Sequence, residues 1–414
     1  MKRAVFLSLV DQVLNSAFNL LLNLAFIAFA TPDEFGRFAF LLAGSFFAAS
    51  AQNALVVMPL NYLLPGREPR EADAALSMLT STNLALVLLV MPASFGLAAV
   101  IGADMSLSLA AIAYFGTLMV REYLRNLMVV KGSVHLTLLY DAIAIVATVV
   151  FAVAFWQVLP PATATLAALS AGNCLSFICC RFDLKSDFGR FSSHLSAYRG
   201  VWKDTRWALQ GALQNEVMAR SHVFLVERMR DAAALGMLNA GRVGVSPLLL
   251  VGTAWCRVAR PRLVEKLARG EVASVLQLLR SGMVVIAGAA ALYGLFLWVA
   301  WPYIDAYAFR DRYGDMAGNL VCWWLYALVV GQTSVMAALM EARRQFRALA
   351  IVGLGGAIIA PLLVFTLLAA GLDASTAALG LAGVALMEFL VFGALTMRDL
   401  RSPAFGANRQ GGVQ

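Results

Sequence analysis

Long apolar stretches follow one another along the chain, separated by short polar connections. Each stretch is close to the roughly 20 residues that an α-helix needs to cross a bilayer. The stretches are continuous rather than short and alternating, which excludes a transmembrane β-barrel. We therefore expect an all-α polytopic membrane protein with about twelve transmembrane helices, over residues 5–29, 37–62, 74–101, 107–130, 134–158, 162–180, 207–227, 234–256, 275–300, 317–340, 348–370 and 374–397.

The first stretch carries a ladder of polar residues, Asp11, Asn15, Asn19 and Asn23, spaced four residues apart. That spacing places all four on one face of a helix. Polar groups that face lipid are costly, so the ladder must face protein or a water-filled cavity. Hydrogen bonding between helices would explain a single asparagine. Four aligned polar residues, one of them an acid, favour the lining of a transport path.

The composition agrees with a membrane protein. The chain is 61% hydrophobic and 14% charged, with a mean hydropathy of +0.77, whereas soluble proteins have about 25% charged residues. The net charge is +8, but the basic residues lie at the ends of the apolar stretches. With a cytoplasmic N-terminus, 22 Lys and Arg residues fall in cytoplasmic connections and five in external ones. This bias predicts that both termini are cytoplasmic and that no nucleic acid is bound.

The longest connection divides the chain into two halves with six expected helices each. We expect an N-terminal six-helix lobe over residues 1–180, a basic cytoplasmic linker over 181–206, a C-terminal six-helix lobe over 207–397 and a cytoplasmic tail over 398–414. The halves also echo each other, because segments 34–38 and 234–238 both open the second helix of their half around a central glycine. The linker is either an amphipathic helix on anionic lipid or a simple tether.

The fourth stretch places Arg121, Glu122 and Arg125 among apolar residues. Arg121 and Arg125 share a helical face, so their charges repel each other unless an anion lies between them. An arginine deep in a bilayer costs about 2.5–3.5 kcal/mol. The pair therefore favours anion binding, since planar guanidinium groups suit phosphate. The alternative is a cytoplasmic helix end from which the arginines reach the interface, because Lys131 is only six residues further on.

The first expected helix of the second half is also polar. Gln210, Gln214 and Asn215 cover more than one of its faces, which requires water or polar partners. Glu216 and Arg220 follow, four residues apart, a spacing that suits an ion pair within one helix.

Later stretches add isolated polar residues. Asn239 and Arg242 share a face, Asp141 is an acid expected to pair with one of the arginines, and Glu388 lies near no obvious cation. We expect the substrate to be bound by Arg121, Arg125, Arg220, Arg242, Asn15, Asn19, Gln210, Gln214, Asn215 and Asn239. The candidates for coupling transport to an ion are Asp11, Asp141 and Glu216.

Sequence motifs of enzymes and metal sites are absent. The three histidines show no metal-ligand spacing, and the five cysteines lie in or beside apolar stretches. The chain has no nucleophile elbow and no phosphate loop. We expect no catalytic residue, no cofactor and no bound metal.

Several motifs carry a resemblance to a known family. Residues 24–42, LAFIAFATPDEFGRFAFLL, resemble the junction of the first two helices in polysaccharide exporters, where the first helix ends in a P-E-x-F/Y-G turn. The segments REYLR at 121–125, LGMLNAGR at 235–242 and RPRL at 260–263 are similar to later features of that family. With its layout of spans, the chain resembles the Wzx-type polysaccharide and O-antigen flippases of the multidrug/oligosaccharidyl-lipid/polysaccharide exporter superfamily.

The resemblance implies two six-helix lobes around a cationic cavity, working by alternating access in the bacterial inner membrane. The substrate would be an undecaprenyl-pyrophosphate-linked oligosaccharide, moved to the periplasmic leaflet for polysaccharide biosynthesis. Membrane lipids and the polysaccharide polymerase machinery would be partners. The cavity arginines of the family would correspond by span and type to Arg125, Arg220 and Arg242. The lipid II branch usually has fourteen helices, which counts against that branch.

Two alternatives stay open at the level of sequence. A multidrug or cation antiporter of the same superfamily would need a net acidic cavity, and the four arginines expected to be buried, Arg121, Arg125, Arg220 and Arg242, argue against one. A polysaccharide polymerase or ligase would need a large external loop, and the longest external connection, 301–316, has about 16 residues.

Overall fold

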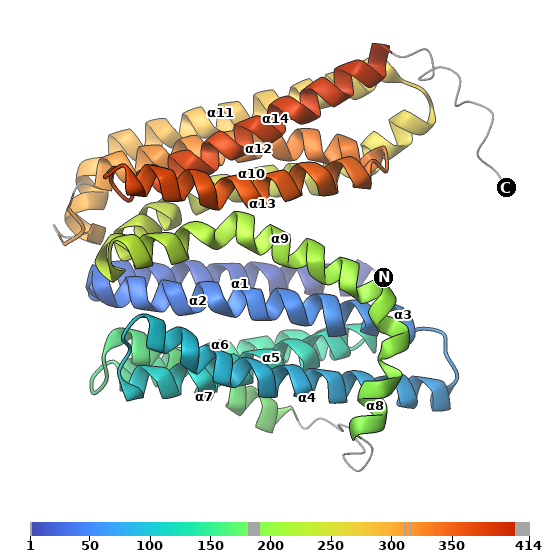
Figure 1. Cartoon of the computed structure of the whole chain (residues 1–414), viewed down its shortest axis with the longest axis vertical. Helices are drawn as coiled ribbons and strands as arrows, with labels where there is room; N and C mark the ends of the chain where they lie inside the picture. Colours follow the sequence, from blue (N-terminus) through green and yellow to red (C-terminus); the bar gives the residue numbers. More distant parts are fainter. Residues whose placement is uncertain (1, 181–190, 310–311, 315, 402–414) are drawn as a thin grey trace. The chain divides into compact units, whose positions relative to one another are not determined.

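The computed structural model describes residues 2–180, 191–309, 312–314 and 316–401. All regular structure in these ranges is helical (Figure 1). The first part of the chain forms α1 (Lys2–Phe29), α2 (Pro32–Gln52), the π-helical turn η1 (Asn53–Val57), α3 (Met58–Leu63), α4 (Pro69–Val100), α5 (Met105–Val130), α6 (Val134–Phe155) and α7 (Pro161–Cys179). The remainder forms α8 (Phe191–Ala197), α9 (Arg199–Met229), α10 (Ala232–Ala268), α11 (Val272–Ile304), the π-helical turn η3 (Asp305–Phe309), α12 (Met316–Ala342), α13 (Phe346–Ala369) and α14 (Thr376–Arg401).

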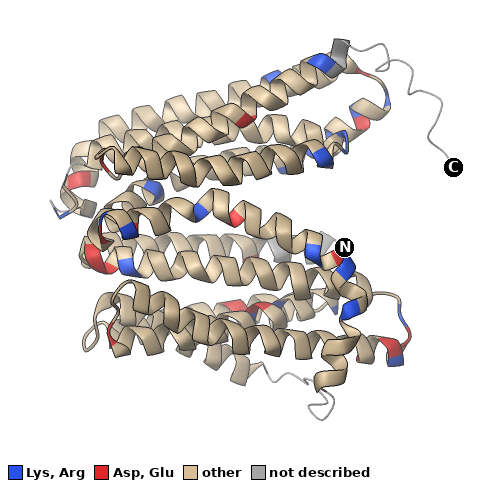
Figure 2. Cartoon of the chain, in the orientation of Figure 1, with Lys and Arg blue, Asp and Glu red and all other residues tan. Residues whose placement is uncertain are grey.

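The expected all-α fold is confirmed, and each of the expected spans coincides with a helical segment. Ten helical segments in the described ranges are long and apolar enough to cross a membrane. The two expected spans outside that set lie in α5 and α9, the helices with the most charged candidate residues. Figure 2 shows most of the charge near helix ends, with a few charged positions partway along. The cytoplasmic placement of the termini stays a prediction.

The chain divides into two compact units. One comprises Met1–Glu216 with Asp231–Gly236, and the other comprises Val217–Arg230 with Met237–Gln414. The boundary passes through α9 and α10, so each of these helices contributes to both units. The expected lobes at 1–180 and 207–397 stay a prediction, and part of the 181–206 linker and of the 398–414 tail lies outside the described residues.

In the first unit, α5 packs against α4 and α7, and α6 packs against α1 and α7. A core cluster joins η1, α4 and α5 through the buried side chains of Val56, Leu79 and Leu124. Capping fixes the helix starts. The Thr31 hydroxyl accepts from the Glu34 amide before α2, and the Asp104 carboxylate accepts from the Leu107 amide before α5.

The described part of the linker is helical and packs on the first unit. His194 in α8 lies 3.0 Å from the Ser81 hydroxyl of α4. The Tyr198 hydroxyl donates to the carbonyl of Leu55 in η1. A π-helical turn leaves its carbonyl groups less regularly paired than an α-helix does, and Tyr198 satisfies one of them.

In the second unit, α12 packs against α11 and α14, and α13 packs against α14. Its core cluster joins α10, α11 and α12 through Leu263, Ile286 and Val335, all buried. The Thr333 hydroxyl of α12 donates to the Ala385 carbonyl of α14 at 2.9 Å, which ties these two helices together.

Candidate functional site

A buried ion cluster lies where α1, α5 and α6 of the first unit meet. Asp141 on α6 is completely buried. Its carboxylate accepts from Arg121 Nη2 at 2.7 Å and from Arg125 Nε at 2.8 Å. The anion that the shared face of the two arginines required is therefore a side chain of the protein itself, and the expected pairing of Asp141 with an arginine is confirmed.

Helix α1 completes this cluster. The Asp11 carboxylate accepts from Arg125 Nη2 at 2.6 Å. The Asn15 amide donates to Asp141 at 3.1 Å and to Asp11 at 3.3 Å, and its carbonyl oxygen accepts from Arg121 at 3.3 Å. The two guanidinium groups thus balance the formal charges of the Asp11 and Asp141 carboxylates, and the Glu122 carboxylate lies 4.0 Å from Arg125 Nη1 as a third acid of the cluster.

The cluster is not fully sealed. The side chains of Arg121 and Arg125 keep 16% and 28% of their surface exposed. Within the described residues, Arg121 Nε has no hydrogen-bond acceptor although it is buried. Buried ion pairs add little net stability, but removing one partner typically costs about 3–5 kcal/mol. The geometry therefore holds the arginines firmly and leaves one buried N–H donor, that of Arg121 Nε, without an acceptor among the described residues.

The polar ladder of α1 divides into two parts. Asp11 and Asn15 belong to the buried cluster, whereas Asn19 is exposed. The Asn23 amide donates to the backbone carbonyl of Asn19 at 2.7 Å, within the same helix. The four residues therefore do not share one environment in this structure.

The candidates on the first half of α9 differ in burial. Gln210 and Asn215 are exposed and Gln214 is half-buried. Glu216 is buried, and its carboxylate accepts from the Ser50 hydroxyl of α2 at 2.7 Å. This hydrogen bond joins Glu216 of α9 to α2.

In the second unit, Arg242 lies over an aromatic ring. Its guanidinium carbon is 5.8 Å from the ring centroid of Trp323, which is completely buried. The His222 ring also contacts Trp323, in an edge-to-face arrangement with the ring centroids 5.5 Å apart. Both His222 nitrogens lack a hydrogen-bond partner among the described residues. Arg220 is half-buried and Asn239 buried on the neighbouring turns of α9 and α10.

Glu388 on α14 is a second notable acid, which the sequence indicated only as lacking an obvious cation. It is buried, and the described residues offer it no hydrogen bond or ion pair. A Cβ atom at Gly356 of α13 would lie 2.5 Å from its Oε1 and 2.9 Å from the sulfur of Met218. The glycine therefore leaves the space that the carboxyl group occupies.

The structure also bears on metal binding. No group of three or more His, Cys, Asp or Glu side chains in the described ranges is arranged to hold a metal ion.

The contact of His222 with Trp323 was not predicted, because His222, Arg242 and Trp323 are distant in sequence and no spacing rule joins them.

Several solved structures of membrane transporters resemble this fold. The inward-facing conformation of a multidrug resistance MATE family transporter of the MOP superfamily matches with a TM-score of 0.67 and 13% identity, over 96% of both chains. The lipid II flippase MurJ in an inward closed conformation matches with a TM-score of 0.69 and 12% identity, over 96% of this chain and 88% of that chain. An outward-facing MATE family transporter matches at 0.59 and 13%, over 96% and 94%.

Sequence comparison adds nothing to this likeness. No protein-family model matches the chain, and no curated protein is significantly similar to it in sequence. The fold is that of MOP-superfamily transporters, as the sequence resemblance implied, and the chain is a multi-pass membrane protein.

Proposed function

We propose that the chain flips an anionic lipid-linked oligosaccharide across the bacterial inner membrane by alternating access. The substrate in this proposal is an undecaprenyl-pyrophosphate-linked oligosaccharide that feeds polysaccharide biosynthesis and is handed to the polymerase machinery. The observation that carries the proposal is the half-buried arginine pair of α5, held by the buried Asp141, in a fold shared over 96% of this chain with a lipid II flippase. Guanidinium groups suit the bidentate recognition of phosphate.

In this mechanism the substrate competes with the carboxylates of the cluster. A pyrophosphate would accept from the same N–H groups of Arg121 and Arg125 that now donate to Asp141 and Asp11. The buried Nε of Arg121 offers one donor that no carboxylate has to release. Amide side chains on α1 and α9, such as Asn19 and Gln210, are exposed and suit the hydroxyl groups of sugars.

Ion coupling follows from the same competition. A proton on Asp11 would weaken its bond to Arg125, because a neutral carboxyl group is a poorer acceptor than a carboxylate. Arg125 would then be free to bind phosphate. Export of an anion is also favoured by an inside-negative potential, by about 2.3 kcal/mol per charge per 100 mV. Asp11, Asp141 and Glu216 remain the candidates for coupling.

The experiment is a deletion strain in which the lipid-linked oligosaccharide and the surface polysaccharide are both quantified. We expect intact precursor to accumulate while polysaccharide disappears, with rescue by the wild-type chain and by Arg67→Ala. Arg67 is the matched control, an exposed arginine that pairs with Glu71 at 3.5 Å. Arg125→Lys, which keeps the charge but loses the planar fork, should reach wild-type membrane levels and rescue poorly. Unchanged precursor and normal polysaccharide would overturn the proposal.

One observation favours a second candidate function. The charges of Arg121 and Arg125 are balanced by Asp141 and Asp11, so the cluster has no cationic excess to repel an organic cation. A multidrug antiporter is therefore the alternative, since the fold also resembles that of a multidrug resistance MATE family transporter. Accumulation of a cationic dye that rises in the deletion strain, with normal polysaccharide, would favour it.

A further inference from the structure

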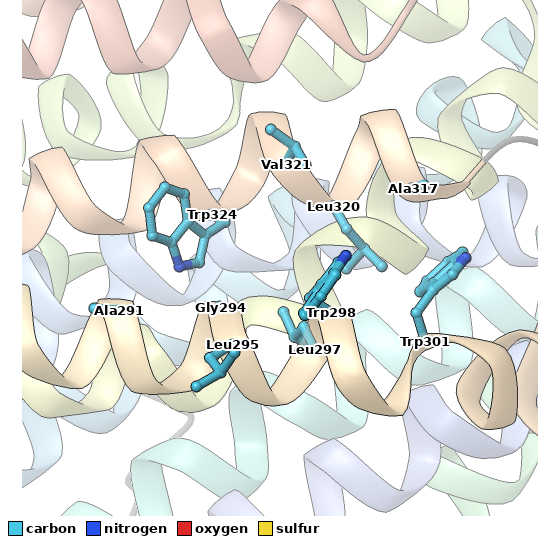
Figure 3. Close-up of a pocket in the computed structure, with 10 residues that line it drawn as sticks. All are labelled: Ala291, Gly294, Leu295, Leu297, Trp298, Trp301, Ala317, Leu320, Val321 and Trp324. Carbon is cyan, nitrogen blue, oxygen red and sulfur yellow. The ribbon is translucent and has the colours of Figure 1, made fainter.

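The second unit carries an apolar cleft between α11 and α12 (Figure 3). Its volume is about 500 Å³. Ala291, Gly294 and Leu295 of α11 form one wall, and Leu320 and Trp324 of α12 form the other. None of these side chains carries a charge, so a hydrophobic occupant is favoured.

The inner end of the cleft is held in shape by a tryptophan. Trp324 Nε1 donates to the backbone carbonyl of Ala290 at 2.9 Å, which fixes the indole across the two helices. A Cβ atom at Gly294 would lie 3.0 Å from this nitrogen, tighter than ordinary packing. The small residue at 294 and the hydrogen bond of Trp324 together define the inner wall.

The length of the cleft corresponds to one leaflet of a membrane. From Ala291 to Trp301 it follows α11 for ten residues, which is about 15 Å at the helical rise. The hydrocarbon core of a bilayer is about 30 Å thick, so one leaflet accounts for about half of it. A single acyl chain suits this length, whereas a long polyprenyl chain exceeds it.

The outer end of the cleft is formed by aromatic side chains that carry polar N–H or O–H groups. Trp298 is 76% exposed, and Tyr303 and Tyr307 beyond it are 70% and 76% exposed. Exposed Trp and Tyr residues of this kind mark the headgroup level of a membrane. Within the described residues, the indole N–H groups of Trp298 and Trp301 have no acceptor. Figure 3 shows both indoles at the end of the cleft away from Ala291.

We propose that this cleft binds one acyl chain of a membrane glycerophospholipid. The chain lies between α11 and α12, and the ester or phosphate oxygens of the lipid accept from the indole N–H groups of Trp298 and Trp301. With cytoplasmic termini, as predicted, the lipid belongs to the periplasmic leaflet. The inference does not depend on which substrate is transported.

The test uses the full chain reconstituted in vesicles of phosphatidylethanolamine and phosphatidylglycerol. A trace of phospholipid with a photoactivatable diazirine in one acyl chain is added and irradiated, and the labelled peptides are identified by mass spectrometry. We expect saturable labelling of 291–301 and 317–324. Ala291→Phe, which fills the cleft, should abolish it. Leu292→Phe, a matched change at a 72% exposed neighbour outside the cleft, should not.

The tryptophans are tested separately. Trp298→Phe with Trp301→Phe keeps both rings and removes both N–H donors, and should weaken the saturable labelling about fivefold. Labelling spread evenly over all lipid-facing helices, or unaffected by Ala291→Phe, would overturn the proposal. Stronger competition by a polyprenyl phosphate than by unlabelled phospholipid would assign the cleft to an isoprenoid chain and overturn it as well. Unchanged labelling of the double tryptophan variant would overturn the role of the indoles.

Discussion

Gly36 and Gly236 lie back to back where the first turns of α2 and α10 meet. A Cβ atom at Gly36 would lie 1.7 Å from the Ala232 carbonyl oxygen, and one at Gly236 would lie 1.9 Å from that of Pro32. The added Cβ at Gly236 would also approach the Gly36 nitrogen to 3.0 Å. These contacts are with backbone atoms, so a side chain at either position requires one helix to move. The two glycines are the central residues of the segments that echo each other in the sequence.

Gly36→Ala and Gly236→Ala should therefore both lower the thermal stability of the purified protein. Overpacking against backbone costs about 1–3 kcal/mol. Gly96→Ala in α4 is the matched control, because nothing lies within 4 Å of its added Cβ. That change should leave stability unchanged or raise it slightly, since alanine favours a helix by up to about 1 kcal/mol. Equal melting temperatures for all three variants would contradict the close approach.

The comparison of sequence and structure shows what hydropathy can predict. Each apolar stretch coincides with a helical segment of the structure. The stretch 234–256 underestimated the length of α10, however, because this helix continues to Ala268. Apolar residues indicate the part of a helix that lies in the hydrocarbon of the membrane. The helix itself can extend further into water, where its backbone hydrogen bonds continue but its side chains are polar. The charged segment beyond Cys256 therefore gave no signal of helix.

The sequence predicted which residue types form the candidate site better than it predicted which of these residues contact each other. Spacing placed Arg121 and Arg125 on one face and required an anion, and Asp141 supplies it. The same kind of spacing placed Asn19 on the same face of α1 as Asp11, yet these two residues lie in different environments. Which part of a polar face meets another helix depends on the tilt and rotation of that helix, which periodicity within one helix does not contain.

Arg125 and Asp11 should be energetically coupled, because the ion pair between them contributes to the stability of the protein only when both side chains are present. Arg125→Ala should lower stability by about 3–5 kcal/mol, because Asp11 and Asp141 lose a common cation. The double variant Arg125→Ala with Asp11→Asn should be less destabilised than the sum of the single variants, by about 0.5–3 kcal/mol. Thermal melting of the four proteins in one detergent measures this coupling. Strict additivity would indicate that the bond is not formed.

Arg230 at the end of α9 is expected to stabilise the C-terminal end of α13. Its Nη2 donates to the backbone carbonyls of Leu368 at 3.1 Å and Leu372 at 2.8 Å. Arg230→Ala should cost about 1.5–3 kcal/mol, the range for hydrogen bonds to charged groups. Arg228→Ala, at an exposed position two residues earlier, is the control and should change the melting temperature little. Equal effects of both changes would argue against this cap.

The cap of α5 should make stability depend on pH. Ser106 and the Leu107 amide donate to Asp104 and hold the pKa of its carboxyl group below the usual value. Its contribution is therefore complete above the unfolded pKa of about 3.9 and is lost as pH falls through the lower folded value. Asp104→Ala should cost about 1 kcal/mol at pH 7. The difference from wild type should shrink towards pH 3, measured by thermal melting.

Glu68 provides the control for this experiment. It occupies the corresponding N-cap position before α4 but makes no side-chain capping bond. Glu68→Ala should therefore produce a smaller loss at pH 7 than Asp104→Ala. A loss for Asp104→Ala that stays constant from pH 7 to pH 3 would show that the carboxylate is not the capping group.

Glu388 and Asp141 should respond differently to the same chemical change. Asp141 faces two arginines, and Asp11 still pairs with Arg125 when Asp141 is replaced. Asp141→Asn therefore leaves the charge of Arg121 without its carboxylate partner and should lower stability by about 3–5 kcal/mol, by comparison with other buried pairs. The described residues give Glu388 no charged partner, and a charge within a span costs about 2.5–3.5 kcal/mol. We therefore expect a neutral carboxyl group, and Glu388→Gln should be tolerated. A Glu388→Gln loss as large as that of Asp141→Asn would instead indicate a bound cation.

The space around Glu388 gives a test that does not change its charge. Gly356→Ala would place a methyl group 2.5 Å from the carboxyl oxygen, so the side chain must move or the helices must separate. Gly355→Ala is the matched control one residue earlier, with no atom within 4 Å of the added Cβ. We expect Gly356→Ala to lower the melting temperature and Gly355→Ala to leave it unchanged or raise it. If Glu388→Gln is tolerated while Gly356→Ala is not, shape rather than charge determines how α13 and α14 pack at this acid.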